Sequence, residues 1–322
     1  MATSLRAPIA TRPLPAGADR VFGPNWFAAV MGTGILATIL DVRVLWVLAA
    51  VLLGGLLVAT AVHRRSYLDH PVQRHFYGAP AMALMTVGSG ALAIFGASPL
   101  VLWFDALLWT AGTALGVATA FAIPARAAGS ALPEVGPWWL MPVVPPTVSA
   151  TTGALLAPYL PAGLARTCFI TLCYGLLILS VVGTVRVLRH LCCRVSRHGF
   201  GAPAMAPTWL IVLGPLGQSV TALHHLGLLS GLAPLTPYAG TPVLLAALGW
   251  LGVAGVVVLR ARPPFGLTWW SFTFPVATVV TGTAALGWGP VAAALTVLLV
   301  CAWLVAALGT VRGAWNGSLL RV

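Results

Sequence analysis

Long apolar stretches alternate with short polar connections along the whole chain. Each stretch is about 20 residues long, which at about 1.5 Å of rise per residue lets a helix cross a bilayer core of about 30 Å. Connections as short as residues 41–43 force neighbouring spans into antiparallel helical hairpins. The pattern predicts an all-α integral membrane fold with ten transmembrane helices, at residues 22–40, 44–62, 76–96, 101–123, 138–160, 166–188, 207–230, 239–259, 268–288 and 290–311.

Proline divides these spans into two kinds. In the ninth span, Pro275 lacks an N–H and leaves the carbonyl of Ser271 without its helical partner. Freed backbone groups at membrane depth are tolerated only where protein or a water-filled cavity receives them. The second, fourth and sixth spans contain no proline, and Pro242 and Pro290 are expected in the first turn of the eighth and tenth. We therefore predict breaks only in the odd-numbered spans, with pore kinks at Pro80, Pro145, Pro146, Pro215 and Pro275.

The odd-numbered spans also share a cluster of small or polar residues, which recurs at intervals of about 60 residues and indicates an internal repeat. Small residues can serve close helix packing, as in GxxxG interfaces. Alternatively, five kinked helices with polar linings surround a central pore while five regular helices face lipid. Because both features are confined to alternate spans, we favour five quasi-repeated helical hairpins around a central pore. The predicted pore lining is Gly32, Thr33, Gly34, Gly88, Ser89, Gly90, Thr151, Thr152, Gly153, Gly217, Gln218, Ser219, Thr281, Gly282 and Thr283.

Composition and charge place the chain in a membrane and orient it there. Of its 322 residues 59% are hydrophobic and only 7% are charged, which excludes a soluble globular protein. All basic residues are arginine, and all except Arg43 and Arg166 fall on one side of the predicted bilayer. The positive-inside rule assigns that side to the cytoplasm. We expect a multi-pass plasma-membrane protein with cytoplasmic tails at residues 1–21 and 312–322 around a pore domain at residues 22–311, and no nucleic-acid partner.

The predicted path is polar but carries no fixed charge. None of the five odd-numbered spans contains Arg, Asp or Glu, which argues against a tight ion site or a carboxylate proton relay. Hydroxyls, backbone dipoles and Gln218 would bind an ion weakly and release it, as a channel or low-affinity carrier requires. Arginine-rich loops and broken helices favour an anion, while a neutral solute or a cation stays open. Asp105, one turn into the fourth span, is expected to snorkel to the interface.

Two adjacent histidines are the candidate pH sensor of the path. His224 and His225 lie near the outer end of the seventh span, and at most one should face the pore because consecutive helical residues point about 100° apart. The alternative places both at the membrane interface, bonded to loop carbonyls.

A membrane-embedded metalloenzyme is the alternative from another class. It would use His224, His225 and the segment at residues 190–198, which contains two histidines and two cysteines. The spacing of that segment fits no metal site, and we expect a solvated cytoplasmic loop there. The sequence has no catalytic carboxylate pair, nucleophile elbow or cofactor motif. We therefore expect no enzyme activity, no cofactor and no metal.

Three motifs resemble a known family. They are GPNWFAAVMGTGI from Gly23, PTWLIVLGPLGQS from Pro207 and WWSFTFP from Trp269. Together they resemble the tellurite-resistance/dicarboxylate transporter family of the voltage-dependent anion channel superfamily, which includes fungal malate permeases and sulfite efflux pumps, bacterial tellurite-resistance channels and plant slow anion channels. The first two motifs resemble the malate and sulfite branch more than the plant branch.

The resemblance implies ten helices in five quasi-repeated hairpins around a central anion pore, assembled as a homotrimer. It also implies a phenylalanine on the ninth helix that blocks the pore, which we place at Phe274 with Phe272 as the alternative. The predicted function is passage of small anions, either C4-dicarboxylates such as malate or sulfite-like oxyanions. A proton-coupled carrier for the same anions is the alternative.

Overall fold

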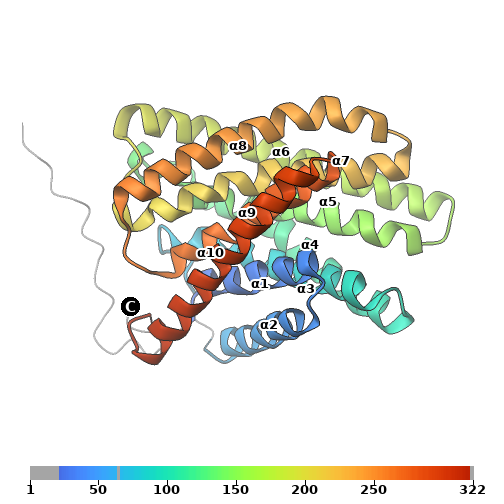
Figure 1. Cartoon of the computed structure of the whole chain (residues 1–322), viewed down its shortest axis with the longest axis horizontal. Coiled ribbons are helices and arrows are strands. Elements are labelled where there is room, and N and C mark those ends of the chain that lie inside the picture. Colours follow the sequence, from blue (N-terminus) through green and yellow to red (C-terminus); the bar gives the residue numbers. More distant parts are fainter. Residues whose placement is uncertain (1–21, 64–65, 320–322) are drawn as a thin grey trace, which may run out of the picture.

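The computed structural model describes residues 22–63 and 66–319, and within them every regular element is a helix. This confirms the all-α prediction and the count of ten helices, whose ends mostly lie within a few residues of those expected. The predicted tail at residues 1–21 lies outside the described residues. The helices are α1 (Phe27–Leu40), α2 (Arg43–His63), α3 (Gly78–Phe95), α4 (Pro99–Ala127), α5 (Pro145–Leu156), α6 (Leu164–His198), α7 (Leu213–Ser230), α8 (Thr236–Ala261), α9 (Phe274–Ala285) and α10 (Gly289–Trp315) (Figure 1).

A 3-10 helix comes shortly before each odd-numbered helix. These are η1 (Pro24–Trp26), η2 (Gln73–Tyr77), η4 (Pro137–Leu140), η6 (Pro203–Val212) and η8 (Leu267–Phe272), with η4 separated from its α-helix by a short turn. The predicted kink prolines all lie in the first three residues of the α-helical part: Pro80, Pro145, Pro146, Pro215 and Pro275. The first N–H groups of a helix have no intrahelical partner, so a proline costs little there. The backbone therefore changes from 3-10 to α just before these prolines.

Two expectations about the even-numbered helices are wrong. The fourth helix is not free of proline, because α4 continues past the predicted span and contains Pro124, and Pro242 lies inside α8 rather than in its first turn. Residues 190–198 are not a loop, because α6 continues through them to His198. Even so, the even-numbered helices are continuous, as neither proline ends its helix.

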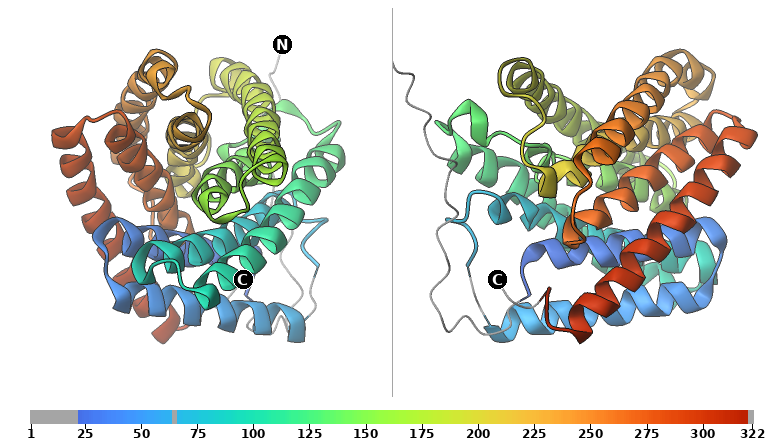
Figure 2. Two further views of the ribbon diagram at one scale, coloured as in Figure 1. Left: turned by 90° about the vertical axis from the view of Figure 1, so that its right-hand side faces the viewer. Right: turned by 60° about the vertical axis from the view of Figure 1, so that its left-hand side comes forward.

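The helices form a buried inner set and an exposed outer set. In α5 every residue except Leu155 is buried, whereas α10 buries only Leu295, Leu299, Ala306 and Gly313. Each odd-numbered helix packs against the next, and α9 also contacts α1, so these five helices form a closed ring. In the left view of Figure 2 the chain passes round the molecule in sequence order, from blue at the bottom through green to gold and red.

By length and composition, six helical segments in the described part of the chain could each cross a membrane. The other four helices, α1, α5, α7 and α9, are shorter or more polar. Part of each of these segments is 3-10, and hydroxyl or glycine residues replace aliphatic ones. The six are α2, η2 with α3, α4, α6, η7 (Ala233–Leu235) with α8, and α10.

Close contact within the ring depends on small residues. At Gly217 of α7 a Cβ atom would overlap the backbone of Thr278 in α9. Backbone atoms cannot rotate away as a side chain can, so only glycine lets these two helices approach this closely.

Candidate functional site: a cavity inside the ring of odd-numbered helices

The ring of odd-numbered helices encloses a cavity of about 340 Å³, which we call the central cavity. Among the described residues, every lining side chain comes from α1, α3, α5, α7 or α9, and neither an arginine nor a carboxylate is among them. The lining residues are Ile35, Thr38, Thr86, Ser89, Val148, Thr151, Thr152, Leu155, Gln218, Thr221, His224, His225, Phe274, Thr281, Ala284 and Ala285.

The hydroxyl groups of the central cavity are bonded to backbone carbonyls of their own helices. Ser89 Oγ donates to the carbonyl of Met85 at 2.8 Å, and Thr152 Oγ1 donates to that of Val148 at 2.8 Å. Thr221 and Thr281 also share a hydrogen bond of 2.9 Å between their hydroxyls, which joins α7 to α9. The hydroxyl protons are therefore engaged, and an ion in the cavity competes for them. The same carbonyl bonds are made by Thr38, Thr86, Thr151, Thr221 and Thr281.

Gln218 supplies the one side-chain amide in the central cavity. Its side chain is 5% exposed, and it makes no hydrogen bond to any residue in the described part of the chain. An amide carries two N–H donors and an acceptor oxygen. Gln218 is therefore a lining group whose donors are free to meet an anion.

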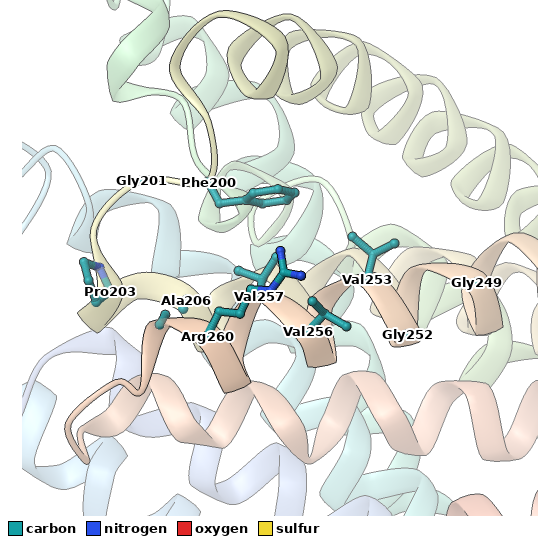
Figure 3. A pocket seen from close by; sticks show the side chains of 11 residues that line it. Phe200, Gly201, Pro203, Ala206, Gly249, Gly252, Val253, Val256, Val257 and Arg260 are labelled. Atoms are coloured by element: carbon teal, nitrogen blue, oxygen red, sulfur yellow. The ribbon is translucent and has the colours of Figure 1, made fainter.

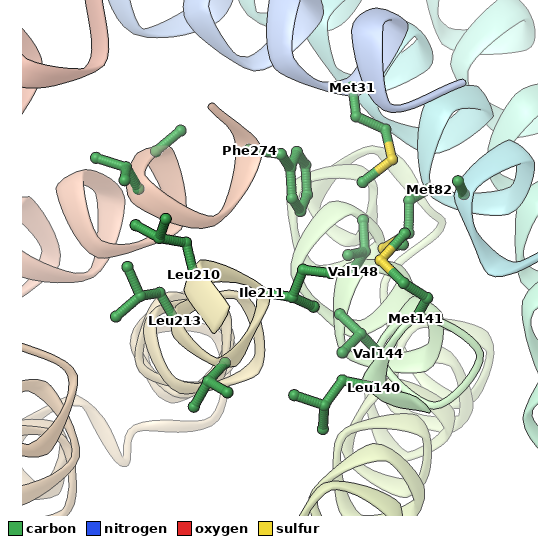
Figure 4. Close-up of a cluster of buried hydrophobic side chains, with 14 of the residues drawn as sticks. Met31, Met82, Leu140, Met141, Val144, Val148, Leu210, Ile211, Leu213 and Phe274 are labelled. Atoms are coloured by element: carbon green, nitrogen blue, oxygen red, sulfur yellow. The ribbon is translucent and has the colours of Figure 1, made fainter. Parts of the chain in front are cut away.

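Phe274 separates the central cavity from a smaller apolar pocket. Its ring lines both spaces, and the apolar pocket, about 30 Å³, is formed with Met31, Phe76, Met82 and Met141 among others. Figure 4 shows Phe274 beside Met31, with Met82, Met141, Val144 and Ile211 around the same space. Ser271 and Trp270 are the polar side chains in the lining of this pocket, and the indole N–H of Trp270 is bonded to Thr310. Because the rest of the lining is apolar, the pocket opposes passage of a hydrated ion.

A family model described as SLAC1, voltage-dependent anion channel, matches residues 21–311. The chain belongs to the voltage-dependent anion channel family. Fungal sulfite efflux pumps named SSU1 are similar to it, and that of Trichophyton rubrum is 26% identical over 310 residues, covering 83% of this chain and 82% of the pump. The uncharacterized transporter MJ0576 of Methanocaldococcus jannaschii is 26% identical over 296 residues, covering 81% of this chain and 82% of that protein.

Family membership confirms the resemblance that the three motifs indicate. The chain is a multi-pass membrane protein of a channel and transporter family, which points away from an enzyme. Among the described residues no group of three or more His, Cys, Asp or Glu is close enough to hold a metal ion.

In this family member the structure places some predicted lining residues in the central cavity and others between helices. The hydroxyl and amide members Ser89, Thr151, Thr152, Gln218 and Thr281 line the cavity. Thr33 instead accepts a hydrogen bond of 3.0 Å from Trp303 of α10, while Ser219 and Thr283 bond to carbonyls of their own helices. The glycines lie against neighbouring helices, as close packing requires: Gly32, Gly34, Gly88, Gly90, Gly153, Gly217 and Gly282.

Sequence reasoning missed several lining residues that lie one helical turn from the predicted ones. Thr86 precedes Ser89 by three positions, and Thr221 follows Gln218 by three. Residues three or four apart share a helix face, so extending each cluster by one turn would have found them. Thr38 is the exception, since its predicted neighbours on α1 do not line the central cavity.

The histidine pair lies at the cavity rather than at loop carbonyls. His224 and His225 both line the central cavity, so the expectation that at most one would face it is wrong. Their ring centroids are 5.6 Å apart in an edge-on arrangement. The cavity is wide enough at this end of α7 for two side chains about 100° apart to border it.

Asp105 does not snorkel. Its side chain is fully buried against Gly88 of α3, and neither carboxyl oxygen has a hydrogen-bond partner among the described residues. The expectation failed because α4 turns this residue inward toward α3, where the missing side chain of Gly88 leaves room for it.

Phe272 and Phe274 occupy different environments. Phe272 stacks on Trp269 with ring centroids 5.5 Å apart and lines neither the central cavity nor the apolar pocket. The two rings, two positions apart in the sequence at the start of α9, thus have different neighbours.

Proposed function

We propose that this protein conducts small anions through a pore along the axis of the ring, with five quasi-repeated helical hairpins around it and Phe274 as the occluding gate. The observation that carries the proposal is Phe274 lying between the central cavity and the apolar pocket, both inside the ring. The family match and the sulfite pumps among the relatives support an anion as cargo.

The lining of the central cavity suits passage rather than capture. Without a fixed positive charge, an anion gains only hydrogen bonds to neutral groups, each worth about 0.5–1.5 kcal/mol net. Weak contacts at several positions allow an ion to enter and leave quickly. Gln218 offers free donors, and hydroxyls such as Thr152 can turn toward the ion at the cost of their carbonyl bonds.

Sulfite-like oxyanions are our first choice of cargo, because named relatives are sulfite efflux pumps. C4-dicarboxylates such as malate remain the second candidate, on the resemblance of the first two motifs. A tetrahedral or pyramidal oxyanion is small beside a cavity of about 340 Å³, so it can reach Gln218 while it keeps part of its hydration shell.

Coupling to protons is the alternative mechanism, favoured by the position of His224 and His225 at the central cavity. We further propose a homotrimer in the plasma membrane with both termini in the cytoplasm, on the distribution of arginines and the family resemblance.

Flux into liposomes that contain the purified protein tests the proposal. We expect sulfite uptake driven by the electrochemical gradient, with malate and chloride as comparison anions. Uptake that requires a pH gradient would identify a coupled carrier instead. Absence of flux for every anion, in protein that is folded by circular dichroism and gel filtration, would contradict anion conduction.

A further inference from the structure

A second, larger cavity lies outside the ring of odd-numbered helices. It is a groove of about 800 Å³ between the segment that follows α6 and the C-terminal half of α8 (Figure 3). It shares no lining residue with the central cavity or the apolar pocket. The groove is lined by Phe200, Gly201, Pro203, Ala206, Gly249, Gly252, Val253, Val256, Val257, Arg260 and Ala261.

The walls of this groove are apolar and open toward the outside of the bundle. A Cβ atom built on Gly249 or Gly252 meets no atom within 4 Å, so the two glycines leave free space. Val253 and Val256, which follow the two glycines on α8, are 42% and 46% exposed. Because α8 belongs to the outer set of helices, hydrocarbon is the medium that this surface meets.

The groove has the length of one bilayer leaflet. Its lining on α8 extends from Gly249 to Ala261, which at about 1.5 Å per residue is roughly 18 Å. Half of a hydrocarbon core of about 30 Å is about 15 Å. An acyl chain of a single leaflet therefore fits along it.

Positive charge gathers at one end of the groove. The exposed Arg260 lines it and reaches from α8 toward the ring of Phe200 (Figure 3). Behind the loop wall, Arg194 lies against Gly201 and donates from Nη1 to the carbonyl of Gly199 at 2.9 Å. Arg194 is 7% exposed, and its Nε has no partner among the described residues.

The segments that form this groove contain no carboxylate side chain. No Asp or Glu follows Glu134 in the sequence, so α6, α7, α8 and their connections contain no carboxylate side chain. Anionic phospholipids are the abundant negative charges at the cytoplasmic membrane surface, the side to which the positive-inside rule assigns Arg260.

We propose that this groove binds an anionic phospholipid, with one acyl chain along Gly249, Gly252 and Val256 and the phosphate at Arg260. The site is distinct from the anion path and independent of whether that path conducts. The groove combines apolar walls as long as one leaflet, free space beside its glycines and the positive charge of Arg260 at one end. A lipid would use all three features, whereas a soluble anion would use only the charged end.

Binding of phosphatidylglycerol to the purified full chain tests the proposal by native mass spectrometry and by the thermal unfolding midpoint, with phosphatidylcholine as the neutral comparison. We expect phosphatidylglycerol to raise the midpoint and phosphatidylcholine not to. Arg260→Gln should weaken phosphatidylglycerol binding about fivefold, the effect of one arginine near an anionic surface. Gly252→Leu should remove binding, because the new side chain fills open space without a clash.

Matched variants keep the test decisive. Gly255→Leu adds the same side chain to α8 at another open position that does not line the groove, and Arg312→Gln removes an arginine from the end of α10, so both should bind like wild type. Unchanged binding in Gly252→Leu would overturn the site. If inorganic phosphate raised the thermal unfolding midpoint as much as phosphatidylglycerol does, the ligand would be a free anion and not a lipid. A lower oligomeric mass of Gly252→Leu by light scattering would show a second copy of the chain in the groove instead.

Discussion

Gly32 of α1 lies against Thr273, the residue directly before Phe274. A Cβ atom on Gly32 would overlap both Oγ1 and Cβ of Thr273, whose side chain is fully buried and donates from Oγ1 to the carbonyl of Trp270 at 2.8 Å. Rotation of the hydroxyl alone would not relieve the overlap. Because Gly32 has no side chain, α1 can approach Thr273 this closely. This contact places the start of α9 and, with it, the proposed gate.

Gly32→Ala should therefore disturb both stability and occlusion. Overpacking of this kind costs about 1–3 kcal/mol, so we expect a lower thermal unfolding midpoint together with altered anion flux. Gly54→Ala on α2 is the control, because a Cβ there meets nothing within 4 Å and alanine favours a helix. An unchanged midpoint in Gly32→Ala would show that α1 and α9 can separate without cost.

Phe274→Ala should raise anion flux several-fold. Loss of the ring joins the central cavity to the apolar pocket and removes the bulkiest group between them. Flux into liposomes measures the effect, with Phe272→Ala as the matched control because Phe272 lines neither space. If Phe272→Ala alone increased flux, the gate would belong to that residue instead.

Gln218→Leu should weaken anion transport while leaving the fold intact. The substitution keeps a similar side-chain size and breaks no hydrogen bond within the described structure. Loss of one neutral hydrogen bond of about 0.5–1.5 kcal/mol predicts a KM that rises about 2- to 10-fold. Ser219→Ala is the control, because that hydroxyl donates to the carbonyl of Pro215 and does not line the cavity. Equal KM values for wild type and Gln218→Leu would exclude direct contact with the ion.

The histidine pair should give transport a dependence on pH. Protonation of either ring would place positive charge at the central cavity. We expect anion flux to rise as the pH falls, and the double substitution His224→Asn with His225→Asn to flatten that profile. Flux profiles of wild type, each single variant and the double variant measure it. A profile that persists in the double variant assigns the titration to another group.

The sequence by itself determined the ten helices and the alternation between two kinds of them. These features are local: a stretch such as residues 290–311 is apolar enough to leave water wherever it lies, and a proline such as Pro275 changes the backbone beside it whatever its neighbours. The three motifs also sufficed to indicate the family, which the family match confirms.

Only the tertiary structure decided which member of each small-residue cluster meets the central cavity. Consecutive residues of a helix point about 100° apart, so in Gly88, Ser89 and Gly90 the rotation of α3 turns Ser89 to the cavity and the glycines to α4 and α2. That rotation follows from packing against helices distant in sequence. The burial of Asp105 against Gly88 and the groove beside Arg260 have the same origin, because each is formed by segments that the fold alone brings together.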